Sequence, residues 1–406
     1  MADAVPVRPL WLTENYPPDR GGMAQSCDRI VRSLRSRGVE VDVAHVSRRY
    51  DQWRVESKAG GRQICCPADD DPAHTLNRLW NVLRRWPVPT HVVAFGGTLP
   101  LLAGPPYAAW LQCPLVTLIR GNDFDTALFS PKKSDVLRHA IRSSAAVCTV
   151  TRDHAARIAA LEPGAELAWI PNGVDTATWQ LLPHDLDDAA RWRAENVPAG
   201  RRVLGLFGQL KQKKGVRFFL EEVERSGVAD RLHLLLVGDL EQDLEEFRRG
   251  SATPESSARR QSLAPSEGEM LSITFLPFRD RFELLPLFAA CDLIVVPSFY
   301  DGLPNVVLEA AALGIPLLTS NAGGMADLLV DGENAIVFEA GDAHDCRRAV
   351  MAAASIDQAS LHALGARCRA AVVEHFNVEQ EAQRYVDLFV EVLRSRSADR
   401  RLREES

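Results

Sequence analysis

The chain has 406 residues, of which 46% are hydrophobic and 25% are charged, and its formal net charge is −7. This length favours two domains with ample core, and the composition is that of an ordinary globular protein. The negative charge argues against a nucleic-acid-binding protein, which usually presents a basic face, so we expect no nucleic acid among the partners.

Cysteine and histidine patterns argue against a bound metal. The eight cysteines form no C-x-x-C pair, and the ten histidines show no ligand spacing, so we expect no metal site. The N-terminus lacks a basic-plus-apolar signal pattern, and no run of about 18 apolar residues spans a membrane. We therefore expect a cytoplasmic protein with reduced thiols; a peripheral contact with the inner face of a membrane stays open.

Apolar runs alternate with helical periodicity along almost the whole chain, which predicts an α/β fold with parallel sheets. The first strand, 9–12, leads into a polar loop with Gly21 and Gly22 and then a helix that stops near Gly38. Further strands are predicted at 39–46, 92–95, 115–119, 145–150 and 167–170, and helices at 73–86, 100–110 and from 151 or 152 to 161. Residues 48–72 are polar and irregular, and no element is assigned to them.

The second half repeats this α/β pattern after a turn cluster at 171–175 and a linker with a short helix at 176–200. Residues 250–269 are rich in Ser, Ala, Pro and Glu, which predicts a mobile excursion. Strands are predicted at 203–207, 232–237, 273–276, 293–296, 316–319 and 335–338, and helices from 216, 282, 305, 343, 361 and 379. Two doubly wound halves in tandem place their strand-to-helix loops at a shared cleft.

The stretch 295–313 combines a short apolar strand, a polar loop and a helix that starts at Pro304 or Asn305. A strand followed by a helix N-terminus favours anions, because backbone N–H groups and the helix dipole point into the loop. Asp301 in the loop and Glu309 one turn inside the helix add acceptors for sugar hydroxyls. The stretch predicts a nucleotide-sugar site, although alone it also fits an ordinary strand–helix unit with a solvated loop.

Three other strand-to-helix loops carry candidate groups: Gly21 and Gly22, the loop 208–215 with three lysines, and the loop 120–125. Backbone N–H groups approach a phosphate closely at glycines, and Lys214 is well placed to neutralise a diphosphate leaving group. Taken alone, the Gly21-Gly22 loop also fits a flexible turn, and the loop 208–215 also fits a solvated basic turn. The loop 120–125 also fits a surface pairing of Arg120 with Asp123 or Asp125. The P-loop, dinucleotide and G-x-S-x-G patterns are absent from the sequence.

These residues together resemble the retaining GT-B glycosyltransferases of family 4, also called glycosyl transferases group 1. That family usually has P-S-x-x-E-G-x-P-x-x-x-x-E-A, and the chain reads P-S-F-Y-D-G-L-P-N-V-V-L-E-A at 297–310, with Asp301 in place of the first glutamate. Also similar are the Gly21-Gly22 loop, the I-P-N-G-V-D run at 170–175, the Lys214-Gly215 turn and the A-G-G run at 322–324. The resemblance covers most of the chain.

The resemblance implies two Rossmann-like domains, with a C-terminal helix that crosses back to the first. Residues 1–175 and 379–406 would form the acceptor domain, 176–200 the linker, and 201–378 the nucleotide-sugar domain. The implied reaction is retaining transfer of a sugar from a UDP- or GDP-sugar to a hydroxyl of a glycan, lipid-linked or small-molecule acceptor, without a cofactor. A nucleotide-sugar epimerase, a glycoside phosphorylase or a non-catalytic nucleotide-sugar sensor on the same architecture stays an open alternative.

The resemblance also implies residue roles. Glu309 would hold the ribose hydroxyls, Asp301 the donor-sugar hydroxyls, and Lys214 the diphosphate. Gln209 stands where the family usually has an arginine, so Lys211 or Lys213 would supply the second cation. In place of the usual histidine near the sugar, the chain offers Arg120 or Asp123. The remaining donor-binding candidates are Gly21, Gly22, Gly208, Phe278 and Arg279 near the base, and the phosphate-binding run Gly302, Leu303, Pro304, Asn305 and Val306.

Overall fold

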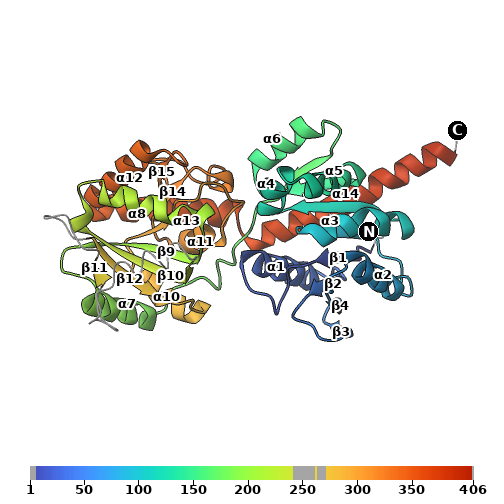
Figure 1. Cartoon of the computed structure of the whole chain (residues 1–406), viewed down its shortest axis with the longest axis horizontal. Helices are drawn as coiled ribbons and strands as arrows, with labels where there is room; N and C mark the ends of the chain where they lie inside the picture. The colour runs from blue at the N-terminus through green and yellow to red at the C-terminus, as the bar shows by residue number, and fades with distance from the viewer. Residues whose placement is uncertain (1–5, 241–260, 263–270, 405–406) are drawn as a thin grey trace. The chain divides into compact units, whose positions relative to one another are not determined.

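The computed structural model describes residues 6–240, 261–262 and 271–404, and the chain divides into two compact units (Figure 1). Unit 1 comprises Met1–Gly173 and Val378–Ser406, and unit 2 comprises Val174–Asn377. Each unit contains a largely parallel sheet covered by helices, so the predicted α/β class is confirmed.

Unit 1 is built on an eight-stranded sheet in the order β3-β4-β2-β1-β5-β6-β7-β8, in which only the β3–β4 pair is antiparallel. Its central strands are buried throughout, as expected where helices cover both faces of a parallel sheet. The strands are β1 (Pro9–Thr13), β2 (Asp42–Ser47), β3 (Arg54–Lys58), β4 (Gly61–Pro67), β5 (His91–Phe95), β6 (Leu115–Ile119), β7 (Ala146–Thr149) and β8 (Leu167–Trp169).

The helices of unit 1 include the end of the chain. They are α1 (Gly22–Ser36), α2 (Pro72–Leu83), α3 (Thr98–Trp110), α4 (Asn122–Leu128), α5 (Pro131–Ser143), α6 (Arg152–Leu161) and α14 (Val378–Glu404). Helix α14 packs against α1, and Arg29 makes two hydrogen bonds of 3.0 Å to the buried Glu381. Tyr385 and Phe389 of α14 enter the same core as Trp11 of β1. The return of the last helix to the first domain is thereby confirmed.

Unit 2 is built on a seven-stranded sheet in the order β11-β12-β10-β9-β13-β14-β15, in which, among the described residues, only the β11–β12 pair is antiparallel. The strands are β9 (Arg202–Leu210), β10 (Leu232–Leu240), β11 (Gln261–Ser262), β12 (Ser272–Leu276), β13 (Leu293–Val296), β14 (Leu317–Ser320) and β15 (Ile336–Phe338). The α-helices of the described residues are α7 (Pro183–Asn196), α8 (Val216–Glu224), α10 (Arg281–Ala289), α11 (Asn305–Leu313), α12 (Ala343–Ser355) and α13 (Gln358–His375).

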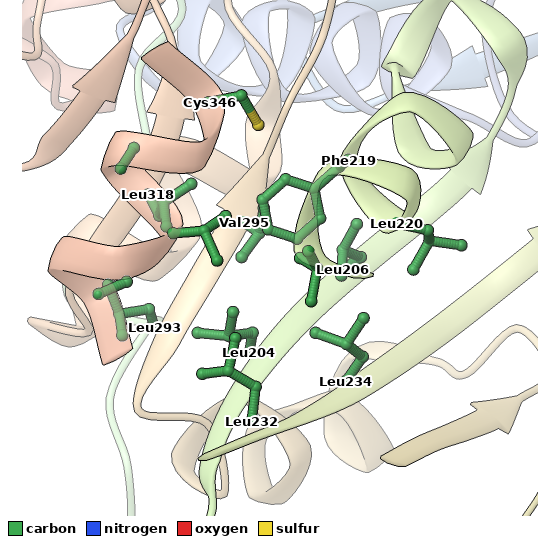
Figure 2. Packing of buried hydrophobic residues seen from close by; sticks show 14 of the residues in the cluster. Leu204, Leu206, Phe219, Leu220, Leu232, Leu234, Leu293, Val295, Leu318 and Cys346 are labelled. Atoms are coloured by element: carbon green, nitrogen blue, oxygen red, sulfur yellow. The ribbon is translucent and has the colours of Figure 1, made fainter. Parts of the chain in front are cut away.

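The core of unit 2 forms where α8 and α12 pack on the sheet. Figure 2 shows Phe219 and Leu220 of α8 packed over Leu206 and Leu234 of the central strands, with Val295 beside them. Phe219 is fully buried, and truncating such a side chain to alanine typically costs about 3–5 kcal/mol. This core fixes the strand ends from which the loops described below emerge.

Three regions differ from the sequence-based expectations. The unassigned region 48–72 contains the β3–β4 hairpin; β3 is an exposed edge strand, so it lacks the apolar alternation that marks a strand. The loop 120–125 turns into helix α4 at Asn122. The predicted linker 176–200 belongs to unit 2, where α7 packs against α10. The predicted excursion 250–269 lies outside the described residues except for β11.

Candidate functional site

The predicted donor loops all leave the same edge of the unit 2 sheet. Strands β9, β12, β13 and β14 run parallel within that sheet, so their carboxyl ends lie together, where ligands bind in open α/β sheets. The loop with Lys214 follows β9, Phe278 and Arg279 follow β12, and the Asp301 loop follows β13. The A-G-G run follows β14.

The lysine turn, residues 211–215, packs directly on the start of the Asp301 loop, residues 297–304. Gly215 has φ +65°, and a Cβ there would lie 2.1 Å from the carbonyl oxygen of Pro297, so the approach requires glycine. Two residues after Pro297, the N–H of Phe299 donates to the carbonyl of Lys213 at 2.9 Å. The lysine turn is therefore held against the next loop by backbone contacts.

The A-G-G run closes the other side of the Asp301 loop. The N–H of Gly324 donates to the carbonyl of Gly302 at 2.8 Å, and the Ser320 hydroxyl donates to the carbonyl of Ser298 at 2.6 Å. Three segments that are far apart in sequence thus form one backbone framework. The structure brings together the motifs that carry the resemblance in this half of the chain.

Asp301 is the charged centre of this framework. Its side chain is 14% exposed; one carboxylate oxygen accepts from Lys214 Nζ, and the other lies 3.7 Å from Lys213 Nζ. Its own Oδ1 also accepts from the N–H of Gly302 at 3.0 Å. Burial alone would raise the pKa of this carboxyl group, but the two lysines and the hydrogen bonds hold the pKa below its usual value. The group is a carboxylate at neutral pH.

Helix α11 begins four residues after Asp301 and presents the positive end of its dipole to the same loop. Its N-cap, Pro304, makes no side-chain capping hydrogen bond, and its first turn contains no acidic residue. Glu309 lies one turn inside the helix and is half-buried. Gly302, Leu303, Asn305 and Val306 occupy the loop and the first helical positions. This geometry favours an anion at the helix end.

The other donor candidates of unit 2 lie at the same sheet edge. Gly208 and Gln209 are exposed at the end of β9, and Lys211 is exposed beyond them. Of the two lysines considered for the second cation, Lys213 lies beside Asp301 and Lys211 does not pair with it. Phe278 is 49% exposed, and Arg279 pairs with Glu283 at 3.0 Å.

The remaining candidates lie in unit 1. Gly21 is the N-cap of α1, with φ 116°, and Gly22 is the first helical residue. Arg120 is buried: its guanidinium donates to Tyr385 Oη at 3.1 Å and to Asn172 Oδ1. The interactions of Arg120 therefore join the loop after β6 to helix α14.

Asp123 faces a different environment from Arg120. Both of its carboxylate oxygens accept from the N–H of Arg120 at 3.0 Å, and burial raises the pKa of its carboxyl group. Asp123 lines a cavity of about 170 Å³ at the carboxyl ends of β1, β5 and β6. Sequence reasoning missed Asn15, Thr98 and Lys133, which line this cavity, and Glu14, which accepts from the N–H of Leu99. Glu14 directly follows β1, and Thr98 directly follows the two glycines after β5, which is the signal that could have identified these two residues.

In the described part of the chain, no group of three or more His, Cys, Asp or Glu side chains could hold a metal ion. Within the same residues, no helix is both long and apolar enough to cross a membrane.

The structural neighbours share the fold at low sequence identity. A sucrose-phosphate synthase from Thermosynechococcus elongatus has a TM-score of 0.77 and 18% identity, with 96% of this chain and 100% of that chain covered. The Anabaena HepE protein in complex with UDP and glucose has a TM-score of 0.73 and 18% identity, with 95% of this chain and 100% of that chain covered. These similarities confirm the GT-B class of fold.

Sequence relatives carry glycosyltransferase names. A D-inositol 3-phosphate glycosyltransferase of Corynebacterium efficiens is 30% identical over 195 residues, 47% of this chain and 40% of that protein. A 2-deoxystreptamine glucosyltransferase of Streptomyces kanamyceticus is 25% identical over 268 residues, 63% of this chain and 65% of that protein. The match therefore spans about two fifths of the length of the inositol-phosphate relative.

Two family models match the chain in different halves. Residues 20–178 match Glycosyltransferase Family 4, and residues 201–355 match Glycosyl transferases group 1. The first range holds the Gly21-Gly22 loop, and the second holds the lysine turn, Asp301 and Glu309. The chain belongs to glycosyltransferase family 4, the glycosyl transferases group 1.

Proposed function

We propose that this protein transfers a sugar from a nucleotide diphosphate sugar, a UDP- or GDP-sugar, to an acceptor hydroxyl with retention of the anomeric configuration. One observation carries the proposal: two lysines and a carboxylate are fixed side by side where helix α11 begins. Cations and a helix N-terminus suit a diphosphate, and a carboxylate suits sugar hydroxyls. The family membership and the neighbour that binds UDP and glucose support the same reaction.

Each group has a defined part in donor binding. Lys214 and Lys213 neutralise the diphosphate, together with the amides at the start of α11 near Asn305 and Val306. Glu309 accepts hydrogen bonds from the ribose hydroxyls. Phe278 and Arg279 lie near the base. No metal is required in this scheme because the cations and the helix dipole stabilise the leaving group.

Donor binding changes the partner of Lys214. In the structure, Asp301 pairs with both lysines. An incoming diphosphate offers the lysines a larger negative charge, so Asp301 is released to accept from hydroxyls of the donor sugar. Because the pKa of Asp301 is held low, it remains a carboxylate and a strong acceptor when it changes partner.

The chemistry follows from a transition state in which the sugar becomes cationic while the diphosphate departs. The bond between the anomeric carbon and the diphosphate oxygen breaks, the acceptor oxygen bonds to that carbon on the same face, and the acceptor proton passes to the departing diphosphate. Stabilising the diphosphate charge in a site that excludes water lowers this barrier more than a strong nucleophile would.

The acceptor and the compartment complete the proposal. Two relatives are named for acceptors that are small rings, inositol 3-phosphate and 2-deoxystreptamine, which favours a small-molecule acceptor. The eight cysteines are all buried free thiols, which favours a reducing cytoplasm. A peripheral membrane contact is tested by sedimentation of the purified protein with anionic vesicles.

The test has two parts. A panel of UDP- and GDP-sugars is first screened for thermal stabilisation, since a ligand at about 100 times its Kd adds about 2.7 kcal/mol. The donor that stabilises the protein is then incubated with acceptors, and the anomeric configuration of the product is read by NMR. An inverted product refutes retention. A sugar epimerised without acceptor supports the epimerase, and donor binding without hydrolysis or transfer supports the sensor.

A further inference from the structure

A long stretch of unit 1 contains no acidic residue. Residues 72–122, which form α2, β5, α3 and β6, include no Asp or Glu, whereas the whole chain has 54 of them and a net charge of −7. The stretch has four arginines, of which Arg120 is buried and Arg78, Arg84 and Arg85 are exposed. Helices α2 and α3 therefore contribute only positive charge to the surface of an acidic protein.

Helix α3 exposes apolar side chains to solvent. Its sequence, Thr98–Trp110, contains no charged residue. A helix that is hydrophobic all round is normally covered on every side, but Leu102 is 41% exposed and Trp110 is 54% exposed. Pro106 lies midway between them at a spacing of four residues, so the three side chains share one face of the helix. An exposed apolar face of this kind marks a site of interaction.

Arginines of two other helices adjoin the end of this face at Trp110. Helices α2 and α3 are in contact (Figure 1), and the ring of Trp80 on α2 lies 4.8 Å from the ring of Trp110. The N–H of Arg84 donates to the carbonyl of Trp80 at 3.0 Å, so Arg84 follows one helical turn later. Arg396 of α14 donates to the carbonyl of Gln112 at 2.7 Å, two residues after Trp110.

The charge of the arginine pair that ends α2 is available to a partner. The guanidinium groups of Arg84 and Arg85 form no ion pair with any residue that the structure describes. Val88, four residues after Arg84, is also exposed. Two unpaired cations thus lie beside an exposed valine and an exposed tryptophan, which calls for a partner that is anionic and also accepts apolar side chains.

A lipid surface meets both requirements. Tryptophan rings sit at the headgroup level of a bilayer, and the apolar face of a helix that lies in the plane of the membrane enters the boundary with the acyl chains. Anionic headgroups attract nearby arginines. A second copy of the chain would bring two positive faces together across a twofold axis, and an acidic protein segment would meet the arginines but leave the apolar face of α3 uncovered.

We propose that the α2–α3 face of unit 1, defined by Arg84, Arg85, Leu102, Pro106 and Trp110, binds the surface of a membrane that contains anionic lipids. The inference rests on the peripheral membrane contact of the proposed function and names the surface that makes it. These five residues lie outside the predicted donor and acceptor residues, so membrane binding and sugar transfer are separable.

Sedimentation of the full chain with lipid vesicles tests the chemistry of the partner. We expect binding to vesicles of phosphatidylglycerol, and we expect this binding to weaken as the salt concentration rises. Vesicles of phosphatidylcholine, which carry no net charge, should bind about 10-fold or more weakly, because each basic residue near an anionic surface contributes about fivefold. Absence of binding to phosphatidylglycerol, or equal binding to both lipids, overturns the inference.

Two arginine pairs test the position of the surface. The double variant Arg84→Gln/Arg85→Gln should bind phosphatidylglycerol vesicles about 25-fold more weakly, at about fivefold for each charge. Arg48→Gln/Arg49→Gln is the matched control: it removes the same formal charge from another exposed pair, in which each guanidinium already pairs with an aspartate. The control should change the affinity by less than about twofold. An equal loss for both pairs would show attraction to overall charge and overturn the inference.

The apolar part of the face is tested by Trp110→Gln, which should weaken vesicle binding about 10-fold through loss of the interfacial indole. Met351→Gln is its control, because Met351 is an exposed apolar residue of unit 2, and its binding should be unchanged. Thermal unfolding shows whether each variant is folded. A dimer in light scattering that Trp110→Gln disperses, without vesicle binding by the parent chain, would identify a second copy as the occupant and overturn the inference.

The outcome separates this inference from the proposed function. Vesicle binding that the arginine and tryptophan variants lose, without turnover of any donor, would leave the surface standing and remove the transferase proposal. Transfer to a soluble acceptor at the same kcat in the parent chain and in Arg84→Gln/Arg85→Gln, with no vesicle binding by either, would do the reverse.

Discussion

Replacing each lysine of the 211–214 turn by alanine separates the cations that meet the diphosphate from the one that does not. Lys214 and Lys213 lie beside Asp301, and their side chains are 25% and 21% exposed, whereas Lys211 is exposed. We expect Lys214→Ala to lower kcat most, Lys213→Ala less, and Lys211→Ala by less than about twofold, a range usual for an exposed charge.

The expected loss in kcat follows from the distances between the lysine and carboxylate charges. Lys213 Nζ lies 3.7 Å from a carboxylate oxygen of Asp301, and Lys214 Nζ is closer. Two unit charges about 4 Å apart interact by about 4 kcal/mol at an effective dielectric constant of 20, which corresponds to a factor of about 10³. Loss of one preorganised donor in other enzymes costs about 10²–10³ in kcat. We therefore expect Lys214→Ala to lower kcat about 10²–10³-fold and Lys213→Ala about 10-fold.

Removing Lys214 also leaves Asp301 with a single nearby cation, and the excess carboxylate charge then repels the diphosphate. The double variant Lys214→Ala/Asp301→Asn removes that repulsion, so its loss in kcat should be smaller than the product of the two single losses. Steady-state kinetics with the donor identified by thermal shift measures all four rates. A normal kcat for Lys214→Ala, or an equal loss for Lys211→Ala, would refute the assignment of the diphosphate site.

Three further predictions concern the donor, helix α14 and pH. Glu309→Ala should raise the Kd for the nucleotide about 10-fold by calorimetry, through loss of hydrogen bonds to a charged acceptor, while unchanged binding would remove its ribose role. Arg29→Met leaves Glu381, 3% exposed, without its main partner and should lower the free energy of unfolding by about 3–5 kcal/mol in urea; hydrogen exchange should rise first in α14. Burial lowers the pKa of His91 from 6.5 to about 4. The stabilising contribution of neutral His91 is therefore present above pH 6.5 and is lost as the pH falls toward 4. In the His91→Gln variant this part of the pH dependence of the unfolding free energy, up to about 1.4 kcal/mol per pH unit, should disappear.

The sequence predicts the buried strands well because their apolar runs are continuous. The strand at 115–119 and the strand at 293–296 have the predicted bounds, since both are fully buried and carry the pattern of a parallel sheet. The helix predicted from 305 also begins there, although Pro304 is its N-cap rather than its first residue. Edge strand β3 has no such pattern because most of its side chains face solvent.

The roles of several site residues could not be predicted because they depend on side-chain partners that are distant in the sequence. The guanidinium of Arg120 meets Tyr385, which is 265 positions away, and no local pattern around Arg120 encodes that contact. Glu14 directly follows a strand, but its role at the start of α3 depends on a residue 85 positions away. The pairing of Asp301 with Lys213 rather than Lys211 depends on how the turn at 212–214 orients each side chain. Motif spacing locates loops, whereas these roles depend on packing.

Helices that follow strands in the two units differ in whether a carboxylate lies at their first turn. In unit 2, helix α11 follows a strand and a polar loop, and no acidic residue in its first turn offsets the helix dipole. In unit 1, Glu14 accepts from the N–H of Leu99 in the first turn of α3, and Asp123 in the first turn of α4 accepts from the N–H of Arg120, whereas α1 has no acidic residue in its first turn. An exchangeable ion pair suits a diphosphate that must enter and leave, and carboxylates fixed by backbone N–H groups suit a ligand that donates hydrogen bonds. The proposed donor chemistry of unit 2 therefore depends on the placement of Asp301 beside Lys213 and Lys214.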